Sequence, residues 1–80
     1  MHSYEILPSL LKKLSKLSKK DRSLYEQVMK KISEIVSTAD VEHYKNLRYS
    51  MKELKRVHVG HFVLVFEYVK PEDKIVFVDF

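Results

Sequence analysis

The sequence predicts an α+β domain, in which an N-terminal strand and two antiparallel helices pack on an antiparallel β-meander. Two observations along the chain indicate this class. Apolar residues recur at helical spacing up to about residue 37, whereas from residue 54 onward they alternate with polar residues. The only glycine of the chain, Gly60, stands within the alternating part, where a tight turn requires it. With 80 residues and no linker or internal repeat, residues 1–80 are expected to form one domain.

The N-terminal part is expected to contain a short strand and then an amphipathic helix. Tyr4 and Ile6 alternate with polar residues over residues 2–6, which favours a weak strand. Pro8 suits the first turn of a helix, where its missing N–H would have no partner in any case. Leucines at helical spacing then predict a helix over about residues 8–18.

A second helix is expected over about residues 22–37. Either Asp21 or Ser18 can cap it by accepting a hydrogen bond from a free N–H of its first turn. Its apolar residues line one face, and the short link to the preceding helix makes the two helices antiparallel neighbours. The mixed residues 38–52 that follow predict a loop with at most one helical turn.

The alternating part begins with a hairpin whose turn is Gly60-His61. A two-residue type II′ turn has a positive φ at its first central residue, which glycine adopts freely. This turn determines the register, and with it the face on which each side chain lies. The core face would carry Val57, Val59, Phe62, Leu64, Phe66 and Tyr68, and the outer face would carry Arg56, His58, Val63, Val65 and Glu67.

The last strand is expected over residues 75–80, after a five-residue turn at 70–74. A turn of that length leaves Phe77 on the outer face, together with Ile75 and Asp79. The side chains then facing inward are those of Val76, Val78 and Phe80. Exposed apolar patches on small domains mark partner sites. We therefore predict that Val63, Val65 and Phe77 bind a partner protein.

Composition excludes several classes of protein and site. The chain has no cysteine, which rules out a disulfide framework and a thiolate metal site. No apolar run reaches the roughly 18 residues of a membrane-spanning helix, and the N-terminus lacks the pattern of a signal peptide, so a cytoplasmic location is expected. The lysine-rich first helix has no Trp or Phe anchor, so we expect no membrane partner. The net charge of +4 favours polyanions, nucleic acid first.

The order of the elements, with Arg56-x-His58-x-Gly60 in the first hairpin, resembles the RelE/ParE superfamily of toxins from type II toxin–antitoxin modules, and more closely its RelE side. Further points of resemblance are Leu47 and Arg48, which stand where the family has a loop leucine, and Phe66 or Tyr68, which takes the place of the family's strand aromatic. The resemblance spans essentially the whole chain.

This resemblance implies a ribosome-dependent mRNA endonuclease that inhibits translation and is silenced by a cognate antitoxin protein. Its partners would be the antitoxin, the ribosome and mRNA, without a small-molecule cofactor. Two alternatives stay open. One is a ParE-like inhibitor of DNA gyrase, and the other is an inert relative that only binds an antitoxin-like partner.

The sequence also departs from the family pattern. His58 replaces the second hairpin arginine and Val63 replaces the third. RelE-like nucleases also use basic residues and often a tyrosine after the last strand, whereas this sequence stops at Phe80. We therefore expect that a short C-terminal segment either lies outside residues 1–80 or is lacking in this member.

The remaining candidates for RNA chemistry are a histidine and several basic residues. His58 is the candidate for proton transfer because histidine titrates near neutral pH, and Arg56 beside it can stabilise a phosphorane. Arg48 and Lys52 are predicted phosphate contacts, as is Lys55 if a bulge near the start of its strand turns it outward.

A half-exposed strand residue without a role is the alternative interpretation of His58. His58 and His61 do not predict a metal site, because they lie on opposite sides of a tight turn and lack a third ligand.

Overall fold

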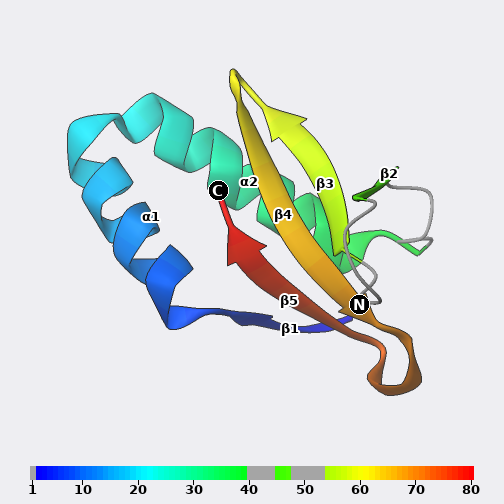
Figure 1. Ribbon diagram of the computed structural model, residues 1–80. Helices are drawn as coiled ribbons and strands as arrows, with labels where there is room; N and C mark the ends of the chain where they lie inside the picture. Colours follow the sequence, from blue (N-terminus) through cyan, green and yellow to red (C-terminus); the bar gives the residue numbers. More distant parts are fainter. Residues whose placement is uncertain (1, 40–44, 48–53) are drawn as a thin grey trace.

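The computed structural model describes residues 2–39, 45–47 and 54–80, and both of its helices lie on one face of a five-stranded sheet (Figure 1). The predicted α+β class is therefore confirmed. The elements are β1 (Ser3–Ile6), α1 (Pro8–Lys20), α2 (Arg22–Ser37), β2 (Lys45–Leu47), β3 (Leu54–Val59), β4 (Phe62–Val69), a 3-10 turn (Lys70–Glu72) and β5 (Lys74–Asp79). None of the helices formed by these residues is long and apolar enough to cross a bilayer.

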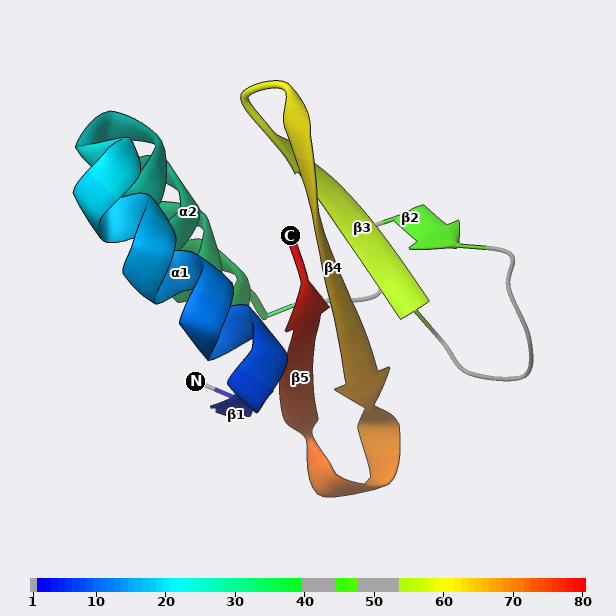
Figure 2. The same cartoon turned by 60° about the vertical axis from the view of Figure 1, so that its left-hand side comes forward.

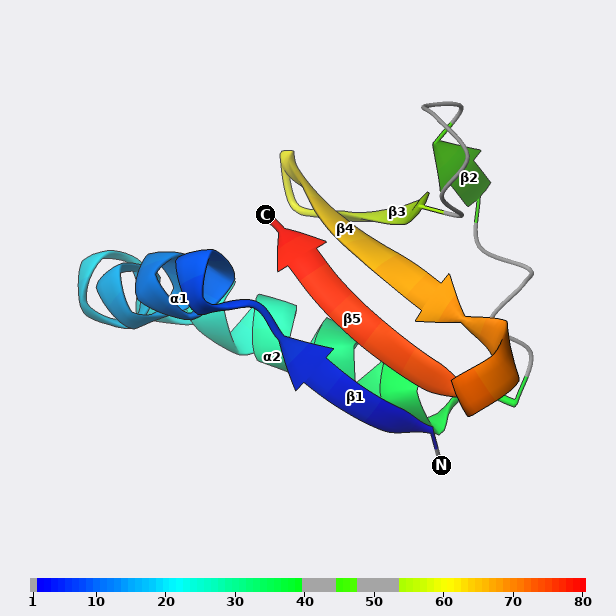
Figure 3. The ribbon, with the colours of Figure 1, turned by 60° about the horizontal axis from the view of Figure 1, so that its bottom comes forward.

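The strand order in the sheet is β1-β5-β4-β3-β2. β3, β4 and β5 form the predicted antiparallel meander, and β1 pairs in parallel with β5 (Figure 3). β2 pairs with the start of β3 and was missed, since Lys45–Leu47 lie within the predicted loop. Three residues are too few to show an alternating pattern, so local sequence contains no signal for this strand.

The two helices meet at Asp21, which serves both of them. Its backbone N–H donates to Leu17 O at 2.8 Å, which ends α1 at Lys20, two residues beyond the expected end. Its side chain accepts from the N–H of Leu24 at 3.1 Å and so caps α2. Of the two predicted caps, Asp21 is therefore the one used, because Ser18 Oγ donates instead to Ser15 O at 2.7 Å.

The hydrophobic core lies between the helices and the covered face of the sheet (Figure 2). Each helix contributes most of the apolar face that its spacing predicted, although Leu11 of α1 is 51% exposed. The buried apolar residues are Leu10, Leu14, Val28, Ile32, Ile35 and Val36 from the helices and Val59, Leu64, Phe66, Ile75 and Phe77 from the sheet.

The hairpin between β3 and β4 has the predicted turn and register. Gly60 has φ +62°, and Val59 pairs with Phe62 across the turn. A Cβ atom added to Gly60 would meet only the side chain of Leu24, at an ordinary contact distance of 3.6 Å. Glycine is therefore required here for its backbone conformation and not for lack of space.

Replacing Gly60 with valine should destabilise the fold by about 1 kcal/mol or more, because a β-branched residue resists a positive φ. Gly60→Asn is the matched control and should cost less, since asparagine tolerates this conformation better. Urea denaturation of the three proteins measures both effects. An unchanged unfolding midpoint in Gly60→Val would contradict the turn assignment.

The connection between β4 and β5 is one residue shorter than predicted, and this reverses the faces of β5. Val69 pairs with Lys74, so the connection consists of the four residues Lys70–Asp73. Asp73 closes it in the left-handed conformation, with φ +49°. A shift of one residue turns every side chain of a strand to the other face. The predicted outward orientation of Phe77 is therefore wrong.

Ile75 and Phe77 are fully buried, whereas Val76 and Val78 are only half-buried. A bulge at Val65/Phe66 then interrupts the pairing of β4 with β5. Phe77 belongs to the core, so it cannot be one of the exposed partner-binding residues.

The turn before β5 is tied to the N-terminus by a group of polar contacts. Nδ1 of His2 lies 2.5 Å from a carboxylate oxygen of Asp73, and Nε2 lies 2.5 Å from Thr38 O. The hydroxyl of Tyr68 donates to the same carboxylate at 3.0 Å. The bonds from His2 and then from Tyr68 hold the pKa of Asp73 below its usual value. β1, α2 and the last turn are thereby held together.

Candidate functional site

The helices leave one face of the sheet without helical cover, and we call it the open face (Figure 2). The strand register places on it side chains from three adjacent strands. The open face comprises Arg56 and His58 of β3, Val63, Val65 and Glu67 of β4, and Val76 of β5.

The two predicted catalytic residues lie together on this face. Arg56 and His58 are both exposed and stand two positions apart on β3. Their side chains therefore project from the same face, about 7 Å apart along the strand. Within the described ranges, neither side chain makes an ion pair or a hydrogen bond. No described residue therefore occupies the polar groups of either side chain.

Two of the predicted partner-binding residues adjoin this pair. Val63 lies opposite His58 and Val65 lies opposite Arg56 in the β3–β4 pairing. Both valines are half-buried. On the open face, the guanidinium of Arg56 and the imidazole of His58 thus lie next to an apolar strip formed by Val63 and Val65. Phe77, the third predicted partner-binding residue, is buried in the core on the other face of the sheet.

Lys55 differs from its two neighbours because it points into the molecule. The pairing of β3 with β4 is regular from Leu54 to Val59, so no bulge turns Lys55 outward there. Its side chain is on the core face and only 2% exposed. The expectation that a bulge presents Lys55 to RNA is therefore wrong. The other predicted RNA contacts, Arg48 and Lys52, lie outside the described residues.

The exposed pair can supply two of the functions that RNA cleavage requires, one proton transfer and stabilisation of negative charge. A histidine can accept a proton from a 2′-hydroxyl or donate one to the leaving 5′-oxygen. A guanidinium can stabilise the negative charge of the phosphorane between these steps. In the part of the chain that the structure describes, no three His, Cys, Asp or Glu side chains are grouped as metal ligands.

A polar hollow of about 310 Å³, which was not predicted, borders His58 at the end of β3. It is lined by His58, Val59 and Gly60 and by polar side chains of α2. The available signal was the polar face of that helix, on which Gln27, Lys30, Lys31 and Glu34 recur at helical spacing. Only the tertiary structure brings this face next to His58.

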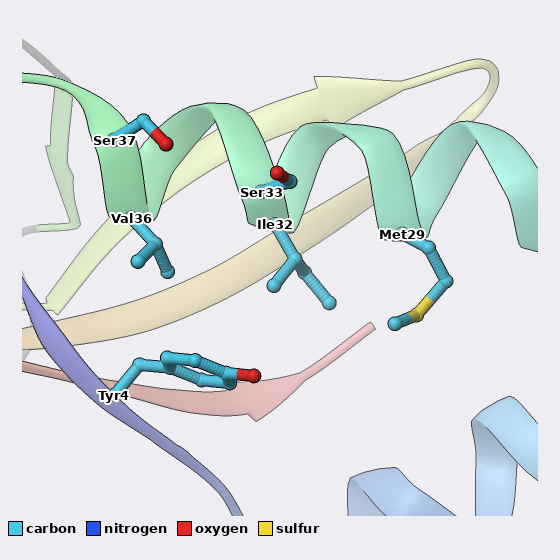
Figure 4. A pocket seen from close by; sticks show the side chains of 6 residues that line it. All are labelled: Tyr4, Met29, Ile32, Ser33, Val36 and Ser37. Atoms are coloured by element: carbon cyan, nitrogen blue, oxygen red, sulfur yellow. The ribbon is translucent and has the colours of Figure 1, made fainter. Parts of the chain in front are cut away.

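A second hollow, of about 250 Å³, lies between β1 and α2 (Figure 4). The ring of Tyr4 lies across from the side chains of Ile32 and Val36, with Met29 further along the helix. Among the described residues, Ser33 and Ser37 complete its lining. None of these described lining residues is charged, and β5 and β4 separate β1 from β3 in the sheet. It is therefore distinct from the Arg56–His58 pair and unsuited to acid–base chemistry.

Comparison with known proteins points to a single family. The chain is 46% identical over 81 residues to "Putative toxin RelE4" of Methanocaldococcus jannaschii, a match that covers all of this chain and 84% of that protein. No family model matches the sequence.

Solved structures with this fold include the E. coli RelBE toxin–antitoxin complex, with a TM-score of 0.77, 20% identity and coverage of 99% of this chain and 93% of the other. The isolated E. coli RelE toxin gives a TM-score of 0.78 at 17% identity, with coverage of 99% and 81%. At these identities the likeness concerns the fold.

Proposed function

This chain belongs to the RelE family of toxins, and we propose that it inhibits translation in the cytoplasm by cutting mRNA on the ribosome. The observation that supports this activity is the Arg56–His58 pair, exposed on the open face. A net charge of +4 further favours a polyanionic target.

In this proposal, His58 and Arg56 have different roles in one transesterification reaction. The 2′-oxygen of the ribose attacks the adjacent phosphorus as its proton leaves, and the bond to the 5′-oxygen breaks as that oxygen gains a proton. His58 carries out one of these two proton transfers, and a water molecule carries out the other. Arg56 stabilises the charge on the phosphorane. The ribosome positions the mRNA, and positioning alone supplies several kcal/mol of the barrier.

Arg48 and Lys52 remain proposed phosphate contacts, which would add to affinity and to its dependence on salt. Lys55 has no place among these contacts because its side chain is buried.

A purified-component assay tests the activity. A defined mRNA is placed on ribosomes with an empty A site, and single-turnover cleavage is followed with saturating protein. Cleavage that requires the ribosome is the expected result. DNA supercoiling by gyrase is measured in parallel. Inhibition of gyrase without mRNA cleavage would instead make the protein a ParE-like inhibitor, and inactivity in both assays would leave a relative that only binds an antitoxin-like partner.

We further propose that a cognate antitoxin covers the apolar strip of the open face. Val63 and Val65 are half-buried and carry no covering element in the described structure. Arg56 and His58 beside them favour an acidic segment. The E. coli neighbour RelBE is itself a complex of a toxin with an antitoxin.

Substituting Val65 with glutamate should weaken the antitoxin complex at least about tenfold, because a carboxylate would enter an apolar contact and face an acidic partner. Arg56 lies opposite Val65 and can pair with the new carboxylate, so the fold should persist. Val65→Ile is the matched control and should bind normally. Calorimetric titration of each variant with the protein encoded by the adjacent gene gives the affinities. Equal affinity of Val65→Glu and the wild type would exclude this strip as the binding surface.

A further inference from the structure

The hollow at the end of β3 brings several hydrogen-bond donors together. One wall is the polar face of α2, and the other is the last residues of β3 with the hairpin turn. The residues that matter are Gln27, Lys30, Lys31 and Glu34 on the helix and His58 and Gly60 on the hairpin. The hollow has a volume of about 310 Å³ and is open to solvent.

The helix residues form one stripe because they are spaced at positions i, i+3, i+4 and i+7. Lys30 is exposed and makes no ion pair within the described ranges. Lys31 pairs with Glu34 at 3.1 Å, yet an ammonium has three donor hydrogens and a carboxylate has about four acceptor positions. The stripe therefore offers two ammonium groups, one amide and one carboxylate with unused capacity.

These groups match the chemistry of a ribonucleotide. Ammonium, amide and imidazole N–H groups can donate to phosphate oxygens. A carboxylate repels phosphate but accepts a hydrogen bond from a hydroxyl, and the 2′-hydroxyl is the group that distinguishes RNA from DNA. A hollow of this composition thus suits a phosphate next to a ribose better than it suits a bare phosphate.

We propose that this hollow binds one ribonucleotide of a single-stranded RNA, with its phosphate on Lys30 and Lys31 and its ribose hydroxyl on Glu34. The inference rests on the proposed function in that it names RNA as the ligand. The His58 side chain lies on the open face and the residue also borders the hollow, so an RNA strand that crosses Arg56 and His58 would pass the mouth of the hollow. The hollow then holds a nucleotide next to the one that is cut, and it contributes affinity and sugar selectivity.

Binding of a fluorescent six-nucleotide RNA, without ribosomes, tests this proposal by anisotropy. Lys30→Gln should weaken binding about tenfold, as expected for loss of a charge-assisted hydrogen bond. It should also reduce the salt slope of the affinity by about 0.7. Lys19→Gln is the matched control, because Lys19 is an exposed lysine in the last turn of α1, away from the hollow. Thermal melts verify that both variants are folded.

The sugar contact has its own readout, which is the ratio of affinities for RNA and DNA of the same sequence. Glu34→Gln should lower the preference for RNA over DNA, because an amide is a weaker acceptor than a carboxylate for the 2′-hydroxyl that only RNA has. Repulsion of the phosphate falls equally for RNA and DNA, so it leaves the ratio unchanged. An unchanged ratio would overturn the assignment of Glu34. Adenosine monophosphate and inorganic phosphate, used as competitors, distinguish a nucleotide site from a phosphate site, and equal competition by the two would overturn the proposal.

Equal losses in Lys30→Gln and Lys19→Gln would also overturn it, because binding would then follow net charge alone. Loss of antitoxin binding with unchanged RNA affinity in Lys30→Gln would assign the hollow to an acidic protein segment instead. The assay needs neither ribosomes nor cleavage, so its failure is separable from failure of the proposed nuclease activity.

Discussion

Replacing His58 with alanine is expected to slow cleavage of ribosome-bound mRNA by about 10²–10⁴-fold, the usual cost of losing a proton-transfer group. The effect should appear in the single-turnover rate at saturating protein, because the substitution removes a chemical step. Substitution of Arg48 or Lys52 should act mainly through affinity and its salt dependence. Varying the protein concentration separates these two kinds of defect.

His61→Ala is the matched control for this experiment. His61 is also an exposed histidine of the hairpin, but it occupies the turn and not the strand face that carries Arg56. Its removal should leave the cleavage rate close to that of the wild type. A wild-type rate in His58→Ala would eliminate this histidine from the mechanism and support the interpretation of His58 as a strand residue without a role.

Replacing Phe77 with alanine should lower the free energy of unfolding by about 3–5 kcal/mol, the typical cost of deleting a buried aromatic side chain. Phe77 is fully buried, and its ring lies 5.9 Å from that of Phe66 and 6.3 Å from that of Tyr4. Small domains have only about 5–15 kcal/mol of stability in total. Urea denaturation measures the loss, and the milder Phe77→Leu keeps it measurable if the alanine variant is unfolded.

Val76→Ala is the control that distinguishes the two possible faces of β5. Val76 is the adjacent residue, half-buried on the open face, and its truncation should cost only about 1 kcal/mol. If Phe77 faced outward, as the five-residue turn predicted, the order of the two losses would be reversed. A larger loss in Val76→Ala than in Phe77→Ala would therefore contradict the register of β5.

Much of the candidate site could be predicted because it depends on a single hairpin. The positive φ of Gly60 determines the turn, and the turn determines that Arg56 and His58 share a face with Val63 and Val65. The role of Lys55 was harder to predict, because it depended on whether β3 is regular or bulged. A bulge is a feature of strand pairing, and the residue types near Lys55 do not indicate whether one is present.

The sequence by itself determined the elements whose signals lie within a few neighbouring residues. Helical spacing, Pro8 and the cap at Asp21 define the two helices, and alternation around Gly60 defines the first hairpin. Only the tertiary structure decided the parallel pairing of β1 with β5, the small strand β2, and the approach of α2 to His58. It also decided the face of Phe77, because Asp73 closes the turn in four residues. Local signals act between neighbours along the chain, whereas the partner of a strand depends on distant residues. The face on which each side chain lies depends also on the length of the preceding loop, because a difference of one residue reverses the faces of the strand.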